Sequence, residues 1–199
     1  KANQDFIFAI IENPFITRTV YLNNNPEFEI PKLYQYFNSS GSKEIMYRTY
    51  ATFPDFIASL PSSSKPIWIQ WIVVDCMSNT NAHCLIYSLM NDNRTQKLLP
   101  ANLHEVMLSV ISTFDQISQI QMAAEIIAGW AKLFPKILNP LLEKLSEKRD
   151  KAKCFILAAL FSHVQMTDDM IMNQIIELNN LAKIDDELCP YVLFALSSL

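Results

Sequence analysis

The sequence predicts an all-α protein in which stacked antiparallel helical hairpins form an α-solenoid segment. From about residue 100 onward, apolar residues recur at three- and four-residue steps, which is the spacing of one helix face. The starts of successive hairpins are separated by about 30 to 40 residues, the period of helical-hairpin repeats. Only two glycines, Gly41 and Gly129, occur among the 199 residues, whereas two-residue β-hairpin turns depend on glycine.

The composition is that of a folded chain outside the membrane. Half of the residues are hydrophobic and 18% are charged, whereas disordered chains combine low hydrophobicity with high net charge. The net charge of −4 argues against a domain whose whole surface binds a polyanion. The longest apolar run, residues 67–77, is interrupted by Gln70 and Asp75 and is shorter than the roughly 20 residues that span a bilayer. We therefore expect a soluble protein.

The scarcity of glycine also excludes several catalytic and cofactor-binding motifs. A P-loop, a dinucleotide-binding fingerprint and a nucleophile elbow each need closely spaced glycines, because the backbone approaches the ligand or turns at positive φ. Gly41 and Gly129 are far apart in the chain. The sequence therefore predicts no cofactor and a protein that is not an enzyme.

Helix starts in the C-terminal part are indicated by capping residues and prolines. Asn102 is expected to begin one helix, its side-chain oxygen accepting a hydrogen bond from a backbone amide. Ser118 and Gln121 form the pattern of a capping box and are expected to begin the next. Further starts are predicted at Asn139-Pro140, where proline fits the first turn, near Lys151, at Thr167 and at Asp185-Asp186.

Two of these helices are predicted to be buried on more than one side. The helix after Ser118 carries one apolar face and a second apolar stripe, so we expect neighbours on both sides. The helix over residues 151–164 is apolar nearly all round, which is typical of a buried helix. The first face consists of Ile120, Ala124, Ile127, Trp130, Ala131 and Phe134, and the second stripe of Met122, Ile126 and Leu133.

The predicted helices pair into hairpins. The starts at Asn102, Asn139 and Thr167 are each followed, after a short turn, by a partner helix. A single hairpin cannot bury its apolar faces alone, so neighbouring hairpins stack into a continuous core. In period and pattern this region, about the C-terminal two thirds of the chain, resembles the HEAT and armadillo class of α-solenoids. The resemblance implies a scaffold whose helical surface binds other proteins.

The N-terminal part is less regular, and we expect one α-helical domain over residues 1–199. Residues 1–64 are divided into short pieces by prolines and polar loops, with a helix over 43–60 kinked at Pro54. Residues 67–74 contain enough β-branched residues to form a buried strand, but the preceding Ser64-Lys65-Pro66 favours a buried helix. The regular part is expected to cover residues 65–199. Because residues 191–196 form an apolar helix without a polar tail, we expect a fragment of a longer chain.

Cysteine and histidine positions do not match a metal site. Cys76, His83 and Cys84 lie close in the sequence, but no Cys-x-x-Cys pair occurs, and Cys154 and Cys189 fall on other predicted helices. Cysteine is among the most buried residue types. We therefore expect small buried hydrophobic residues and no bound metal.

The remaining polar motifs are predicted to be structural. His163 lies on an apolar face and is expected to be a core residue rather than a general base. The pairs Asp168-Asp169 and Asp185-Asp186 fall at helix starts, where they complement the helix macrodipole. The triplets at Asn38 and Asn93 match the glycosylation sequon, but nothing else indicates a secreted disulfide scaffold. We expect an intracellular protein, in the nucleus or the cytoplasm.

One stretch of the chain is strongly basic. Residues 132–153 hold seven of the sixteen basic residues and a net charge of about +4, against about −8 elsewhere. The pattern favours a solvated helix edge with pairs such as Glu147 and Lys151; the alternative is a patch that binds an acidic segment or a phosphate backbone. The seven are Lys132, Lys136, Lys144, Lys148, Arg149, Lys151 and Lys153.

These patterns lead to three functional hypotheses. The first is a non-enzymatic scaffold, a subunit of a larger complex, that binds a protein partner through an acidic segment. Its expected contact residues are Lys144, Lys148, Arg149 and Lys151. The second is a nucleic-acid- or chromatin-associated helical-repeat subunit that uses the 132–153 stretch. The third, an enzyme, would require a preformed pocket that brings His104 or His163 together with a carboxylate.

Overall fold

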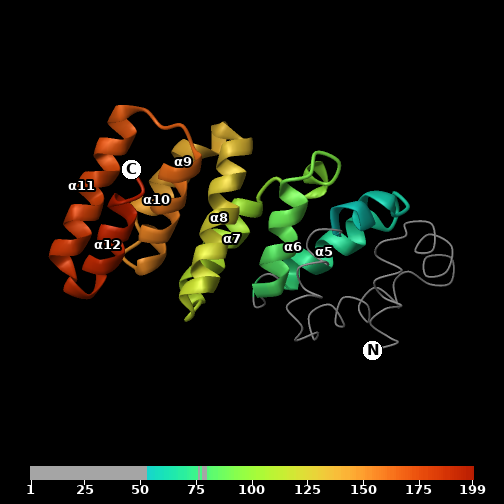
Figure 1. Cartoon of the computed structure of the whole chain (residues 1–199), viewed down its shortest axis with the longest axis horizontal. Helices are drawn as coiled ribbons and strands as arrows, with labels where there is room; N and C mark the ends of the chain where they lie inside the picture. The colour runs from blue at the N-terminus through green and yellow to red at the C-terminus, as the bar shows by residue number, and fades with distance from the viewer. Residues whose placement is uncertain (1–52, 76, 78–79) are drawn as a thin grey trace. The chain divides into compact units, whose positions relative to one another are not determined.

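The computed structural model describes residues 53–75, 77 and 80–199 of the chain (Figure 1). Within these ranges the chain forms α-helices and short 3-10 helices joined by turns, and no strand. The predicted all-α class is therefore confirmed. Contacts within the chain divide it into two compact units, residues 1–101 and residues 102–199, whereas the sequence predicts one domain.

In the first unit, the described helices are residues 53–59, α5 (Lys65–Asp75), α6 (Thr80–Met90) and the 3-10 helix η2 (Gln96–Leu98). The helix predicted over residues 67–74 is thus confirmed and the strand alternative is wrong. Its burial is one-sided, however. Trp68, Ile69 and Ile72 are buried, while Trp71 and Val74 are 43% and 59% exposed. The reason is that α5 packs on its neighbours along one face only. Pro54 is the second described residue of the helix over 53–59, whereas residues 43–52 of the predicted 43–60 helix lie outside the described residues, so the predicted kink stays a prediction.

Aromatic packing joins the helix over residues 53–59 to α5. The ring of Trp68 lies edge-on to Phe56 and Phe53, with centroid distances of 4.9 and 6.2 Å. All three side chains are almost fully buried. Edge-to-face pairs of this kind stabilise a core beyond the burial of apolar area.

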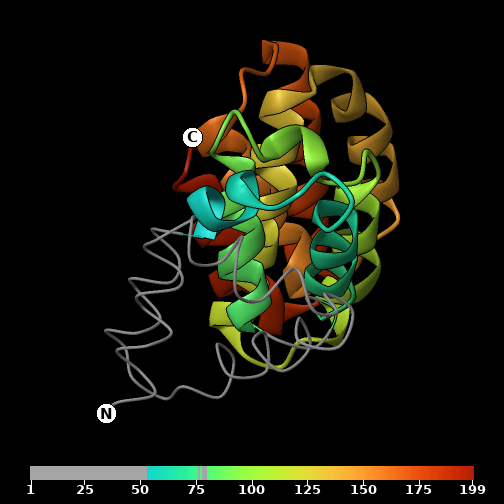
Figure 2. The same cartoon turned by 90° about the vertical axis from the view of Figure 1, so that its right-hand side faces the viewer.

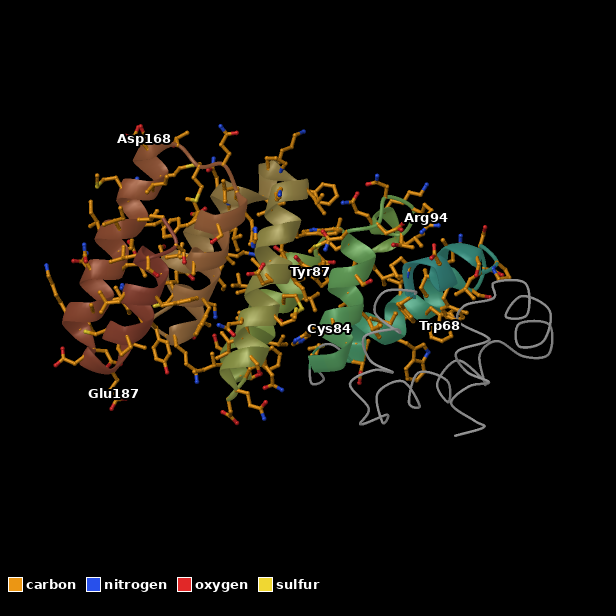
Figure 3. All side chains as sticks on the ribbon, viewed as in Figure 1. Trp68, Cys84, Tyr87, Arg94, Asp168 and Glu187 are labelled. Atoms are coloured by element: carbon orange, nitrogen blue, oxygen red, sulfur yellow. The ribbon has the colours of Figure 1, made fainter. Side chains whose placement is uncertain are left out.

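The turn after α6 explains the Asn93 sequon. The Thr95 hydroxyl is buried and donates to the Leu89 carbonyl oxygen at 2.8 Å, satisfying an orphan acceptor at the end of α6. Arg94, labelled in Figure 3, lies 2.6 Å from carboxylate oxygens of both Asp92 and Asp55, and it lowers the pKa of Asp92. The triplet therefore has a structural role in this turn. The Asn38 sequon lies outside the described residues.

The second unit contains six α-helices and three short 3-10 helices. In it α10 packs between α8 and α12, while α7 packs on α8 and α11 packs on α12. Figure 1 shows these helices standing side by side, and Figure 2 shows them from the side, where they largely overlap. The elements are α7 (Leu103–Val110), η3 (Ile111–Thr113), α8 (Ile117–Leu133), η4 (Pro135–Ile137), α9 (Leu138–Ser146), α10 (Lys151–His163), α11 (Asp168–Ile184), η5 (Asp186–Leu188) and α12 (Cys189–Leu196).

The helix start predicted at Asn102 is confirmed, because α7 begins at Leu103, but two of the predicted capping hydrogen bonds are wrong. Asn102 precedes α7, but its side chain makes no capping hydrogen bond, because its backbone (φ −93°, ψ 20°) lacks the extended conformation that a capping residue needs. Ser118 is already inside α8, which begins at Ile117 after the extended backbone of Gln116. By contrast Thr167 has the extended conformation, and its side chain accepts from the Met170 amide, as predicted. Figure 3 shows Asp168 and Glu187 at opposite ends of the α11 region.

The predicted burial of α8 and α10 is largely confirmed. Both apolar sides of α8 are covered, since Trp130 and Ile126 are 1% and 0% exposed and α7 and α10 pack against the helix. Residues 152–160 of α10 are buried without interruption. Leu133 and Phe134 are exceptions, at 38% and 43% exposed, because α8 ends at Leu133 and its neighbours no longer cover them.

Candidate functional site

The basic stretch does not form one surface patch. Lys132 and Lys136 are exposed near the end of α8 and the start of α9, while Lys148, Arg149 and Lys151 lie beyond the other end of α9. The nine residues of α9 separate the two groups by roughly 14 Å at 1.5 Å per residue. The relevant basic surface is therefore the turn between α9 and α10, with Lys144 nearby.

Two lysines at this turn bind acceptors of the preceding hairpin. The Lys144 ammonium lies 2.6 Å from the Glu105 carboxylate on α7, which lowers the pKa of Glu105. The Lys148 ammonium donates to the Ser112 hydroxyl at 2.6 Å. Ser112 in turn donates to Asp150 at 2.6 Å. These bonds connect the last turn of α9 to the first turn of α7, and the α9–α10 turn to η3.

The other two predicted contact residues differ from each other. Lys151 donates to the Asp115 carbonyl oxygen at 3.4 Å, so its predicted pairing with Glu147 is not what orients it. Arg149 is exposed. Of the four, Arg149 is the residue best placed to meet a partner without breaking a contact described in this turn.

Lys153 lies outside this surface altogether. Its side chain is 0% exposed, and its ammonium lies 2.7 Å from the Glu177 carboxylate on α11. The prediction that Lys153 belongs to a basic surface stretch is therefore wrong. It sits two positions after Lys151 on α10, which turns it toward a different side of the helix.

A hollow of about 260 Å³ lies over α10, between α8 and α12. Its α10 residues are spaced i, i+3, i+4 and i+7, so they form one stripe along the helix. The small side chains in this stripe leave room between the two flanking helices. The hollow is lined by Gln121, Ala124 and Glu125 of α8, by Phe155, Ala158, Ala159 and Ser162 of α10, and by Phe194 and Ser198 at the C-terminal end.

The α12 side of the hollow is aromatic. The rings of Phe155 and Phe194 are 5.3 Å apart between centroids, and that of Tyr191 is 5.7 Å from Phe155. Phe155 is buried, whereas Phe194 is 41% exposed. The hollow therefore has a partly exposed aromatic ring on its α12 side and the polar side chains of α8 on the other.

The α8 side carries an acidic group paired with histidine. The imidazole Nε2 of His163 lies 2.8 Å from the Glu125 carboxylate, and these side chains are 38% and 37% exposed. The prediction that His163 is a core residue is wrong, because it is the last residue of α10, beyond the buried stretch. This is a histidine–carboxylate pair beside a hollow, the geometry that the enzyme hypothesis required.

The hydroxyl groups of the two serines in the hollow donate to backbone carbonyl oxygens of the preceding helical turn. Ser162 donates to the Ala158 carbonyl oxygen at 3.0 Å, and Ser198 donates to that of Phe194 at 3.2 Å. Each hydroxyl oxygen keeps lone pairs for a ligand. The polar groups contributed by Glu125 and the two serines are therefore hydrogen-bond acceptors, while the Gln121 amide can either accept or donate.

The cysteines and histidines do not gather into a metal site in the described part of the chain, where no cluster of three or more candidate ligands occurs. His83 is buried and Cys84 half-buried; Cys76 lies outside the described residues. Among the same residues, no helix is long and apolar enough to cross a bilayer.

Cys154 is expected to be unreactive in the folded chain. Burial raises the pKa of its thiol to about 12, and only the thiolate is nucleophilic. We expect iodoacetamide at pH 8 to label Cys154 at least about 100-fold more slowly in the native chain than in urea. Peptide mass spectrometry with time would measure this, with the half-buried Cys189 as internal control. Equal labelling of the two thiols in the native chain would contradict the burial of α10.

The hollow was missed by the sequence analysis. The small residues Ala158, Ala159 and Ser162 at helical spacing were visible as a stripe, and such a stripe permits close approach. Which residues stand opposite it depends on how α8 and α12 pack, and these helices are distant in the sequence.

No protein-family model, curated protein or solved structure matches this chain. The described residues therefore define the class of this molecule by themselves: they are helical, and in the second unit a hollow lies over α10 between α8 and α12.

Proposed function

We propose that this protein is a non-enzymatic scaffold that binds another protein as a subunit of a larger complex, with residues 102–199 forming an α-solenoid segment of the HEAT or armadillo type. The observation that carries the proposal is the packing of α10 between α8 and α12. Helices that pack side by side in succession offer one extended surface, as stacked helical hairpins do. That surface contains the hollow.

The basic turn and the hollow form one continuous site in this proposal. Lys151 lies one helical turn before Phe155 on α10, so both belong to the same stripe. A partner segment that runs along this stripe meets Lys151 and Arg149 at one end and the hollow at the other. An acidic portion of the segment faces Lys144, Lys148, Arg149 and Lys151.

Charge around the turn favours a protein over a nucleic acid. The carboxylates of Glu105 and Asp150 lie among the lysines: Glu105 accepts from Lys144, and Asp150 accepts from Ser112 and lies 4.0 Å from the Lys148 ammonium. Such interleaved carboxylates repel a continuous phosphate backbone, whereas a protein segment of mixed charge can match both signs.

The His163–Glu125 pair fits a binding role better than catalysis. Each side chain is more than a third exposed, so water hydrates both groups. Catalytic acids and bases are usually tuned by burial and by neighbouring charges in a closed site. Here the pair limits one end of an open hollow.

The test is purification of the chain with its partners, beside the variant Arg149→Glu/Lys144→Glu and the control Lys136→Glu. The control reverses a charge of the same stretch at the other end of α9. All three changes are at exposed positions, so we expect the free energy of unfolding to change by less than about 0.5 kcal/mol for Arg149→Glu and Lys136→Glu. For Lys144→Glu, which also breaks the exposed ion pair with Glu105, we expect a loss of up to about 1 kcal/mol. Lys148 is left intact because a glutamate there would face Asp150, the cap of α10.

We expect mass spectrometry to show proteins that bind the native chain and Lys136→Glu but are lost from Arg149→Glu/Lys144→Glu. Retention of those proteins in the double variant would place the contact elsewhere than the basic turn. If no protein binds the native chain specifically, the scaffold proposal is wrong. If nucleic acid co-purifies with the native chain and its binding weakens steeply as salt is raised, the nucleic-acid-associated alternative is favoured.

A further inference from the structure

We propose that the hollow over α10 binds the guanidinium side chain of an arginine that the partner protein presents. The proposal rests on the proposed function, because it names the chemistry of a partner at the same surface. It follows from the sign of the charge, the direction of the hydrogen bonds, the aromatic wall and the size of the hollow.

Charge and hydrogen bonding select a cation with many donors. Glu125 supplies a net negative charge while His163 is neutral, and one of its oxygens remains for a ligand when the other accepts from His163. Ser162 and Ser198 donate within their own turns, so both present acceptors. A carboxylate or phosphate ligand would find repulsion here, while a guanidinium has five donors and no acceptor.

The apolar surface suits the rest of an arginine side chain. Ala158 and Ala159 can pack against its methylene stem, which long basic side chains bury along apolar surface. Phe194 is 41% exposed and lines the hollow, so its ring is available for a guanidinium to stack on. A planar guanidinium can reach acceptors on more than one side at once, whereas an ammonium is a compact point charge.

The size of the hollow argues for one side chain rather than a metabolite. Its volume of about 260 Å³ is below the range of roughly 300 to 1,000 Å³ found for small-molecule sites. A side chain carried on a partner segment also fits the neighbouring basic turn. The segment then places an arginine in the hollow and acidic residues one or two helical turns away.

The experiment is a titration of the 199-residue chain with N-acetyl-arginine amide, followed by the amide NMR signals of α10. The matched probe is N-acetyl-citrulline amide, which has nearly the same shape and no charge. We expect the arginine compound to shift the signals of residues 155–162, and citrulline to bind at least about threefold more weakly.

Three variants separate the contribution of the Glu125 charge to arginine binding from that of the Phe194 ring. Glu125→Gln keeps an acceptor for His163 and removes the charge, and it should weaken arginine binding about threefold to fivefold. Phe194→Leu keeps an apolar side chain and should weaken it about twofold. Glu143→Gln, an exposed glutamate of α9, is the control and should leave the affinity unchanged.

Equal binding of arginine and citrulline, or arginine binding that Glu125→Gln does not change, overturns the assignment. So does an arginine titration that leaves the signals of α10 unshifted. These outcomes concern the hollow alone. If they occur while Arg149→Glu/Lys144→Glu still loses its partners, the scaffold function stands and only the arginine site is wrong.

Discussion

Replacing Trp130 with alanine is expected to lower the free energy of unfolding by about 3 to 5 kcal/mol, the range for truncating a large core residue. Trp130 is 1% exposed, and its ring lies 4.7 Å from that of Phe134. It belongs to α8, which is covered by α7 on one side and α10 on another. The void left by the indole cannot be filled without moving these helices, so the lost contacts are not replaced.

The measurement is urea unfolding followed by far-ultraviolet circular dichroism, which does not depend on the tryptophan signal. Leu133→Ala is the matched control, because Leu133 is on the same helix but 38% exposed; its cost should be below about 1 kcal/mol. If both variants unfold at the same urea concentration, α8 is not sandwiched as described.

The second large effect concerns the buried Lys153–Glu177 pair. Glu177→Gln removes the negative charge and leaves the Lys153 ammonium, which is 0% exposed, without a counter-ion. Breaking a buried ion pair in this way typically costs 3 to 5 kcal/mol. Since the Glu177 side chain is 35% exposed and water can approach it, we expect a smaller loss, about 2 to 3 kcal/mol.

Lys153→Met provides the complementary test. Methionine fills a similar volume and needs no counter-ion, so this variant should be as stable as the native chain or more stable. The double variant Lys153→Met/Glu177→Gln should regain most of the stability lost by Glu177→Gln, and the difference measures the coupling of the pair. If Glu177→Gln leaves the free energy of unfolding unchanged, the Lys153 ammonium reaches water and α11 packs less closely on α10.

The helices themselves were predictable because their signals are local. The burial of α10 follows from nine apolar or small positions in near succession, and the cap at Thr167 from a residue type with a specific hydrogen bond to make. The same reasoning failed at Asn102. A cap depends on backbone conformation as well as residue type, and the backbone at Asn102 does not extend.

The exposure of charged and titratable residues was less predictable. His163 was expected in the core because its sequence neighbours are apolar, but the burial of α10 stops before the helix ends. Leu133 and Phe134 continue an apolar stripe in the sequence and are exposed for the same reason. Periodicity gives the face of a helix and not the length over which a neighbour covers it.

The sequence by itself determined the all-α class, the order of the helices and which of them have apolar faces, because these properties depend on residues three or four positions apart. The tertiary structure alone decided that Lys151 lies at the surface and Lys153 in the interior, although both are lysines in the first turn of α10. It also decided which side chains surround the hollow. The physical reason is that their partners, Glu177 on α11 and the side chains of α8 and α12, come from distant parts of the chain, so only the packing of helices brings them together.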